Sequence, residues 1–202
     1  MQPFVTLTAV AAPYDPINVD TDQIIPGRFL LKRRTDPAYP TYLFHDLRFA
    51  ADGSERPEFV LNMPAYRGAQ IFVGNENFGG GSSREAAAIA FATYGVRCVI
   101  AVSFGDIFYS NCIKNGILPV RLDNASAAAL RSQLHTRPGA TLTVDLPAQT
   151  VTDVSGTAHA FEIDSFNKAC LIEGMSQIAL TLRHSEAIDA FERRYRETVS
   201  WV

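Results

Sequence analysis

Two serines and one arginine follow three consecutive glycines at the start of a predicted helix. Residues 75–95 read NENFGGGSSREAAAIAFATYG, and the polar groups at the helix start come from Ser82, Ser83 and Arg84. The amino terminus of a helix carries unpaired backbone N–H groups and the positive end of the helix dipole, so it attracts anions. A guanidinium matches a carboxylate or a phosphate, and a hydroxyl in such positive surroundings can transfer a proton. These residue types suit a di- or tricarboxylic acid.

The same residues also allow a purely structural interpretation. Ser82 and Glu85 form the pattern S-x-x-E, a capping box that only starts a helix. The glycines before it could serve to turn the chain (Gly79, Gly80 and Gly81). The segment lacks both the lysine of a phosphate-binding P-loop and the G-x-G-x-x-G spacing of a dinucleotide site. From the residues alone, capping and anion binding both remain open.

A second candidate segment spans residues 17–40, INVDTDQIIPGRFLLKRRTDPAYP. Its three prolines and its basic run predict a loop and not a regular element. Within it, residues 27–40, which we call the basic loop, carry four basic side chains against one acidic, a net +3 (Arg28, Lys32, Arg33 and Arg34 against Asp36). Long loops are often functional, but a solvated surface loop has the same composition. Asp20 and Asp22 could orient the basic groups or cap a turn.

The elements that must position these segments alternate between strand and helix. After an opening strand at 4–13, the apolar patterns predict strand, helix, strand, helix and strand at residues 69–74, 84–94, 97–103, 105–116 and 117–122. Gly95 stands where a helix end favours glycine. Alternation of this kind predicts a parallel sheet with helices packed on it.

The pattern changes after residue 123. We expect a helix at 124–134, three short antiparallel strands at 140–146, 149–154 and 159–164, and two helical stretches beginning at Phe166 and Ser185. The prediction is an α/β protein with a parallel βαβαβ core, additional antiparallel strands and C-terminal helices. It forms a single domain over residues 1–202, with a C-terminal helical extension from about residue 165.

Composition narrows the class of protein. The chain has 202 residues, of which 47% are hydrophobic and 19% charged, and its net charge is −3, so nothing global favours nucleic acid or a membrane. No secretory leader and no apolar run long enough for a membrane span is visible, which predicts a cytoplasmic protein. The three cysteines form no CxxC pair and are expected to be buried thiols (Cys98, Cys112 and Cys170).

Other polar and aromatic residues are expected to be structural. The four histidines show no metal-ligand spacing (His45, His135, His159 and His184). Phe104, Phe108 and Tyr109 have the helical spacing of core residues. Lys114 and Asn115 are expected at a helix end.

Three long motifs occur in order along the chain: NVDTDQIIPGRFL, NFGGGSSRE and SFGDIFYSNCIKNGILPV. With the later LTLRHSEAIDAFE, they closely resemble the small subunits of 3-isopropylmalate dehydratase, the leucine-pathway member of the aconitase superfamily. The resemblance implies an aconitase-type swivelling β/β/α domain that binds no cofactor itself. It also implies a separate large subunit with a [4Fe-4S] cluster, and the interconversion of 2- and 3-isopropylmalate by dehydration and rehydration.

The resemblance also assigns roles. Ser82 corresponds to the serine that removes a proton from the substrate as an alkoxide, and Ser83 and Arg84 to residues that bind a substrate carboxylate. The iron of the partner would bind the leaving hydroxyl. In the family, the loop after the DTD motif determines which variable substituent of the substrate is accepted. The apolar residues of this loop in the present chain would favour an isopropyl branch. We place Phe29, Leu30, Leu31 and Arg34 against the substrate, with Asp20, Asp22, Gly79, Gly80 and Gly81 in support.

One departure leaves the substrate open. Family members commonly have a histidine where this chain has Ala86, and a glycine at 80 or 81 replaces a cysteine of bacterial relatives. A related citraconate or methylmalate hydro-lyase therefore stays an alternative, as does a non-catalytic anion-binding module. The retained Ser82 and Arg84 argue against the latter. We expect the isolated chain to be inactive.

Overall fold

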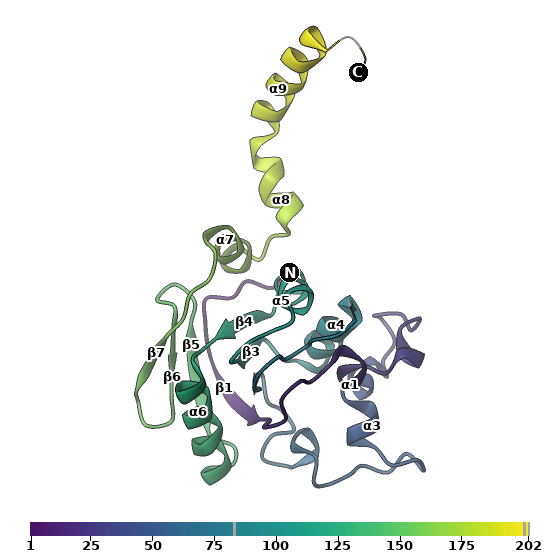
Figure 1. The fold of residues 1–202 in the computed structure, drawn as a ribbon, viewed down its shortest axis with the longest axis vertical. Coiled ribbons are helices and arrows are strands. Elements are labelled where there is room, and N and C mark those ends of the chain that lie inside the picture. Colours follow the sequence, from purple (N-terminus) through teal and green to yellow (C-terminus); the bar gives the residue numbers. More distant parts are fainter. Residues whose placement is uncertain (83, 200, 202) are drawn as a thin grey trace.

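A seven-stranded sheet organises the protein, with strand order β4-β3-β2-β1-β5-β6-β7. The computed structural model describes residues 1–82, 84–199 and 201 (Figure 1). One half of the sheet is parallel and consists of β1 (Thr6–Pro13), β2 (Ile71–Val73), β3 (Cys98–Ala101) and β4 (Leu118–Arg121). The other half is antiparallel and consists of β5 (Thr141–Asp145), β6 (Thr150–Thr152) and β7 (Ala158–Ala160). The predicted parallel core with added antiparallel strands is confirmed.

Helices connect the parallel strands as predicted. They are α4 (Glu85–Tyr94), α5 (Asp106–Lys114) and, after β4, α6 (Asn124–Thr136). Gly95 ends α4 with a φ of 108°, and its N–H bonds the carbonyl groups of Phe91 and Ala92. A left-handed backbone of this kind is strained for other residues, so glycine sets the end of this helix.

Short helical turns occupy the segment that the prolines predicted to be a loop. They are α1 (Thr21–Ile24), a 3-10 turn (Gly27–Phe29) and α2 (Tyr39–Tyr42), followed by α3 (His45–Arg48) and a second 3-10 turn (Val60–Asn62). The Asp20 carboxylate caps α1 by accepting from the Gln23 N–H at 2.7 Å. The expectation of irregular structure was therefore wrong at these turns, and the Asp20 cap organises the first of them locally.

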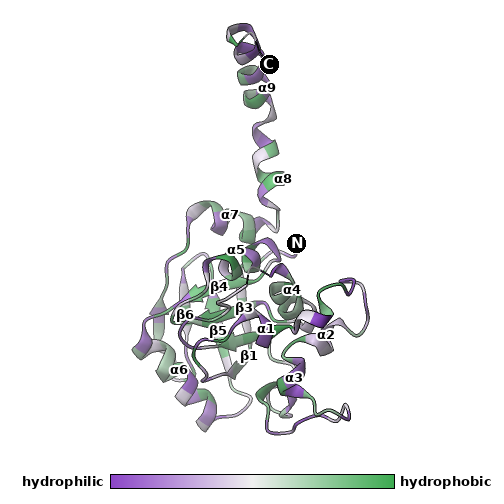
Figure 2. Cartoon of the chain, turned by 45° about the vertical axis from the view of Figure 1, so that its right-hand side comes forward, coloured by the Kyte–Doolittle hydropathy of each residue, from purple (hydrophilic) through white to green (hydrophobic). Residues whose placement is uncertain are grey.

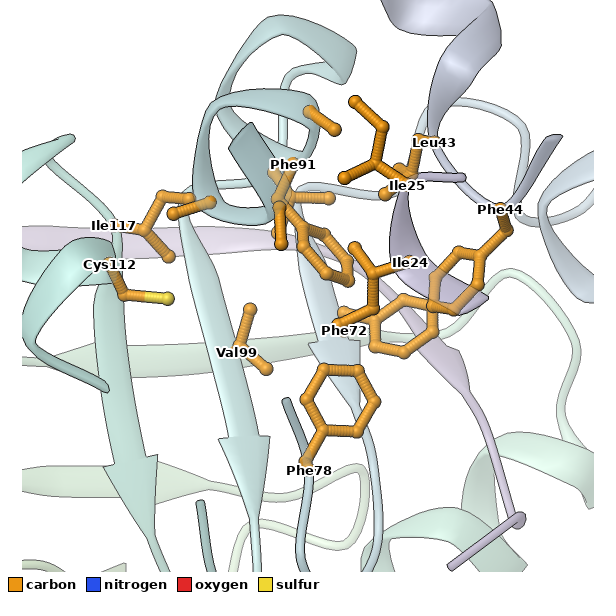
Figure 3. Packing of buried hydrophobic residues seen from close by; sticks show 14 of the residues in the cluster. Ile24, Ile25, Leu43, Phe44, Phe72, Phe78, Phe91, Val99, Cys112 and Ile117 are labelled. Atoms are coloured by element: carbon orange, nitrogen blue, oxygen red, sulfur yellow. The ribbon is translucent and has the colours of Figure 1, made fainter. Parts of the chain in front are cut away.

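Both faces of the parallel half are buried. Phe72 of β2 and Val99 of β3 face the cluster under α1, α2 and α4, where the rings of Phe72 and Phe91 lie 5.2 Å apart (Figure 3). On the other face, Ile71 of β2 packs in a second cluster with residues of α6. Since side chains alternate along a strand, β1, β2 and β3 each contribute residues to both clusters. Because both faces of these strands are packed, the edge of the sheet on which the motif loops lie is held in place.

The C-terminal helices differ from the body of the protein. In α7 (Ser165–Glu173) Cys170 and Leu171 are buried, whereas no residue of α8 (Gln177–Thr181) or α9 (Ser185–Thr198) is buried. A 3-10 turn joins them (Leu182–His184). Figures 1 and 2 show α8 and α9 extending away from the sheet with mixed polar and apolar residues. Among the described residues, no helix combines the length and the apolar character that crossing a bilayer requires.

Candidate functional site

The three sequence motifs meet at one edge of the sheet. Each begins just after a parallel strand: the DTD motif after β1, the glycine-rich motif after β2 and the SFGD motif after β3. In an open parallel sheet the carboxyl ends of the strands form the usual ligand-binding edge. The fold therefore brings the predicted site segments together where α/β proteins bind ligands.

Backbone hydrogen bonds join the three motif segments. The N–H groups of Gly79 and Gly80 donate to the Val19 carbonyl at 2.7 and 3.2 Å, and the Thr21 N–H donates to the Gly80 carbonyl at 3.1 Å. On the other side, the Phe78 N–H donates to the Ser103 carbonyl at 2.9 Å. The glycine-rich segment is thus held between the other two, so its position does not depend on side-chain contacts alone.

Close packing explains the first glycine of the motif. Gly79 has a φ of +71°, and a Cβ atom there would lie 2.7 Å from Phe108 Cβ and closer still to the Phe108 ring. Phe108 is buried on α5, and its ring lies 5.8 Å from that of Phe78. Any side chain at position 79 would displace α5 from the motif. The glycine does more than turn the chain: it lets the segment lie directly on α5.

Ser82 is exposed, and a buried residue holds its backbone in place. The Thr21 hydroxyl donates to the Ser82 carbonyl at 2.8 Å, and Thr21 itself is only 1% exposed. This contact anchors the residue while leaving its side chain on the surface. Ser83 lies outside the described residues.

The capping box, one of the two alternatives for this segment, is not formed by Ser82. The N-cap residue of α4 is Arg84 and not Ser82, and among the described residues no side chain caps this helix. The reason is tertiary: Thr21 holds the Ser82 backbone, and the Arg84 guanidinium pairs with the Asp22 carboxylate. With no cap among the side chains that the structure describes, the amino end of α4 favours anions.

The two aspartates of the DTD motif have different roles. Asp20 caps α1, as one alternative suggested, while Asp22 binds Arg84 and not a side chain of the basic loop. The Arg84 side chain is 20% exposed and the Asp22 side chain 54% exposed. The guanidinium is thus held in a defined place at the start of α4, with part of it accessible to a ligand.

The basic loop divides into packed and exposed residues. Phe29 stacks on Tyr42 with ring centroids 4.3 Å apart, whereas Leu30 is 38% and Leu31 98% exposed. Arg28 donates to the Asp46 carboxylate, and this bond keeps the pKa of Asp46 below its usual value. The two leucines are exposed to a ligand, whereas Phe29 is half-buried against the core.

Two residues without a predicted chemical role hold the site together. Thr21 anchors Ser82, and Asn115 joins Arg34 of the basic loop to Glu85 of α4. Thr21 lies within the DTD motif, and this position was the one feature of the sequence that could have indicated a role for Thr21. Asn115 stands at the predicted helix end, but its partners could not be read from the sequence. Ala86 is half-buried against the core cluster under α4.

The chain offers no assembled ligand set for a metal cluster among the residues that the structure describes. No three His, Cys, Asp or Glu side chains converge there. The cysteines are buried free thiols, as expected, and burial raises the pKa of Cys98 and of Cys112. Thiols of this kind are poor ligands because the thiolate is the binding form. Phe104 and Phe108 are buried and Asn115 follows α5, as predicted.

A cavity of about 410 Å³ lies at the other end of the strands and is not the candidate site. It is lined by the first residues of the chain together with Arg97, whose guanidinium donates to the Pro3 carbonyl at 2.9 Å. This arginine serves to hold the amino-terminal segment on the sheet.

Three family models match successive parts of the chain. The model described as Aconitase C-terminal domain matches residues 1–125, and the model described as LeuD_N matches residues 128–165. The model for the C-terminal domain of the 3-isopropylmalate dehydratase small subunit matches residues 178–202. The first of these covers the parallel half of the sheet and all three motif loops.

Relatives match over the full length. The 3-isopropylmalate dehydratase small subunits of Rhodopseudomonas palustris (strain TIE-1) and Cereibacter sphaeroides (strain KD131) are each 49% identical to this chain, over 201 and 202 residues, with 100% of both chains covered. A crystal structure of 3-isopropylmalate dehydratase from Methanocaldococcus jannaschii DSM2661 is 25% identical with a TM-score of 0.63, covering 93% of this chain and 99% of that one. The resemblance inferred from the three motifs is confirmed. The chain belongs to the family of small subunits of 3-isopropylmalate dehydratase, a hydro-lyase of the aconitase family.

Proposed function

We propose that this chain supplies the base and a carboxylate-binding arginine to a two-chain hydro-lyase that interconverts 2- and 3-isopropylmalate in leucine biosynthesis in the cytoplasm. The observation that carries the proposal is the amino end of α4, where exposed Ser82 and the partly exposed Arg84 guanidinium lie at the ligand-binding edge of the sheet. Two anchors support this placement, Thr21 beneath Ser82 and Asp22 beside Arg84.

The reaction needs a base on one carbon and an acceptor for hydroxide on the next. Ionised Ser82 takes the proton as the C–H bond breaks, a C=C bond forms, and hydroxide leaves the neighbouring carbon. Rehydration reverses these events with the two carbons exchanged. A serine hydroxyl is a poor base in water, so the helix dipole and Arg84 must stabilise the alkoxide. Arg84, with Ser83, binds a substrate carboxylate and sets which carbon faces the base.

The acceptor for hydroxide belongs to the large subunit in this proposal. A [4Fe-4S] cluster held there would supply the Lewis acid. The described residues of this chain present no converging ligands for it, and the cysteines are buried. Two subunits would then each contribute half of one active site, which accounts for the exposed position of Ser82 on the isolated chain.

The basic loop supports a substrate with an apolar branch. Leu30 and Leu31 are its exposed large apolar side chains, and an isopropyl group gains from burial against them. Arg34, which lies on the same loop, supplies positive charge for the carboxylates of the substrate. Ala86, partly buried against the core cluster, stands where family members commonly carry a histidine, and this difference keeps a substrate such as methylmalate as the alternative.

Ultraviolet absorbance of the conjugated product tests the proposal. The chain is mixed anaerobically with a cluster-loaded large subunit from the same cell, and 2-isopropylmalate is compared with methylmalate. We expect a rise with 2-isopropylmalate, and none with either subunit alone. A signal with methylmalate alone would move the assignment to the related hydro-lyase. Dehydration by this chain alone, freed of iron, would overturn the division of roles, and no signal with either substrate would favour a non-catalytic module.

A further inference from the structure

The side chain of Asn115 joins three segments that meet beside the candidate site. Its Oδ1 accepts from Arg34 Nη1 at 3.2 Å, and its Nδ2 donates to Glu85 Oε1 at 3.1 Å. The same Nδ2 also donates to the Asn111 carbonyl at 2.9 Å. The amide therefore uses its acceptor for the basic loop and its donor group for α4 and α5.

The backbone at Asn115 is well anchored. The residue follows the last turn of α5, and its N–H bonds the carbonyls of Asn111 and Cys112 at 3.1 and 3.0 Å. Helix α5 is the same element that packs against Gly79 through buried Phe108. Asn115 is thus fixed relative to the glycine-rich motif, while Arg34 lies on an exposed part of the basic loop.

A primary amide matches both neighbours at once. Arg34 can only donate and ionised Glu85 can only accept, so the bridging group must offer both an acceptor and a donor, and the amide of Asn115 offers them on separate atoms. A carboxylate would suit Arg34 and repel Glu85. An ammonium group would do the reverse. The contacts therefore select against a charged side chain at this position.

We propose that Asn115 is a positioning residue that fixes the basic loop beside the start of α4 through Arg34 and Glu85. This inference rests on the proposed function, because it takes the loop to contact the substrate. Asp22 already holds Arg84 on the other side of the same helix start. With both attachments in place, the part of the basic loop that carries Leu30 and Leu31 keeps a constant position relative to Ser82. Loss of the amide lets the loop move, which weakens substrate binding and leaves the base in place.

Kinetics of the two-chain complex test the positioning role. For Asn115→Ala we expect the KM for 2-isopropylmalate to rise about tenfold with kcat within about twofold, as removal of a hydrogen bond to a charged group predicts. Asn115→Asp gives a similar rise because it repels Glu85. Adding Glu85→Gln to Asn115→Asp restores a donor opposite the new acceptor and brings KM back toward the wild-type value. Asn167→Ala on α7 is the matched control and leaves both constants unchanged.

Amide hydrogen exchange on the isolated chain tests the attachment without any need for activity. In Asn115→Ala and in Arg34→Ala, the amides of residues 28–36 exchange faster, while those of α4 exchange as in the wild type. Unchanged exchange of the loop in both variants would overturn the proposal. Faster exchange with an unchanged KM would overturn the positioning role, as would a failure of Glu85→Gln to restore KM in Asn115→Asp. A wild-type complex without activity contradicts the proposed function alone, and the exchange of the loop then decides the attachment.

Discussion

The start of α4 and the pair α8–α9 differ in how the rest of the protein supports their exposed side chains. Around α4, buried Thr21 holds the backbone of the exposed Ser82, and Asp22 holds the partly exposed Arg84. In α8 and α9 no residue is buried, and large apolar side chains are open to solvent (Ile178 74% and Phe191 58% exposed). An isolated helix of this length is marginal in water. The site is thus built into the body of the chain, whereas α8 and α9 contribute little to it.

The same substitution in the two regions gives the largest expected contrast. Phe91→Ala removes a fully buried ring that packs between Phe72 and Phe78, and we expect it to lower the free energy of unfolding by about 3–5 kcal/mol. Phe191→Ala on α9 removes a ring that is 58% exposed, and we expect a change below about 0.5 kcal/mol. Urea unfolding of the isolated chain measures both. Equal losses would show that α9 belongs to the cooperative core.

A comparison of two glycines tests whether the glycine-rich motif depends on close packing against α5. Both Gly79 and Gly53 have positive φ, but a Cβ atom at Gly79 would overlap Phe108, whereas nothing lies within 4 Å at Gly53. Gly53→Ala should cost about 1–2 kcal/mol for the left-handed backbone, and Gly79→Ala about 1–3 kcal/mol more for the overlap. Urea unfolding again provides the measurement. If the two substitutions cost the same, the motif would not depend on close packing against α5.

The smallest expected effect on stability is at the ion pair of the site. Asp22→Asn removes an exposed partner of Arg84, so stability should change by less than about 1 kcal/mol. The freed guanidinium is no longer fixed, and the KM of the two-chain complex for 2-isopropylmalate should rise while kcat stays near that of the wild type. Steady-state kinetics and urea unfolding on the same preparation separate the two effects. A lower KM would mean that Asp22 competes with the substrate carboxylate.

Much of the fold follows from local patterns. The apolar strands, the helix closed by Gly95 and the change to antiparallel strands are all visible in hydrophobic period and turn residues. The turns between residues 17 and 40 were missed because prolines there suggested irregular structure. Capping by Asp20, which depends on a single side chain, organises the first of these turns.

The details of the site depend on contacts that no local pattern encodes. The spacing of Ser82 and Glu85 predicted a capping box, but Thr21, 61 residues away in sequence, holds the Ser82 backbone and Asp22 holds Arg84. Asn115 lies 81 residues from Arg34 and 30 residues from Glu85. Its position at a helix end was predictable, and its contacts were not. The residue types in the sequence indicate the chemistry of the candidate site. The tertiary contacts determine which side-chain atoms there remain accessible to a ligand.

Turnover of Ser82→Ala in the two-chain complex tests the central claim most directly. Ser82 is exposed and only its backbone carbonyl is bonded within the described chain, so the variant should fold and assemble as the wild type does. Ser54→Ala, at an exposed serine far from α4 in sequence, serves as the control. We expect kcat for 2-isopropylmalate to fall by about 10²–10⁴-fold in Ser82→Ala, as loss of a catalytic base does, with KM nearly unchanged. A kcat within about threefold of that of the wild type would contradict this expectation.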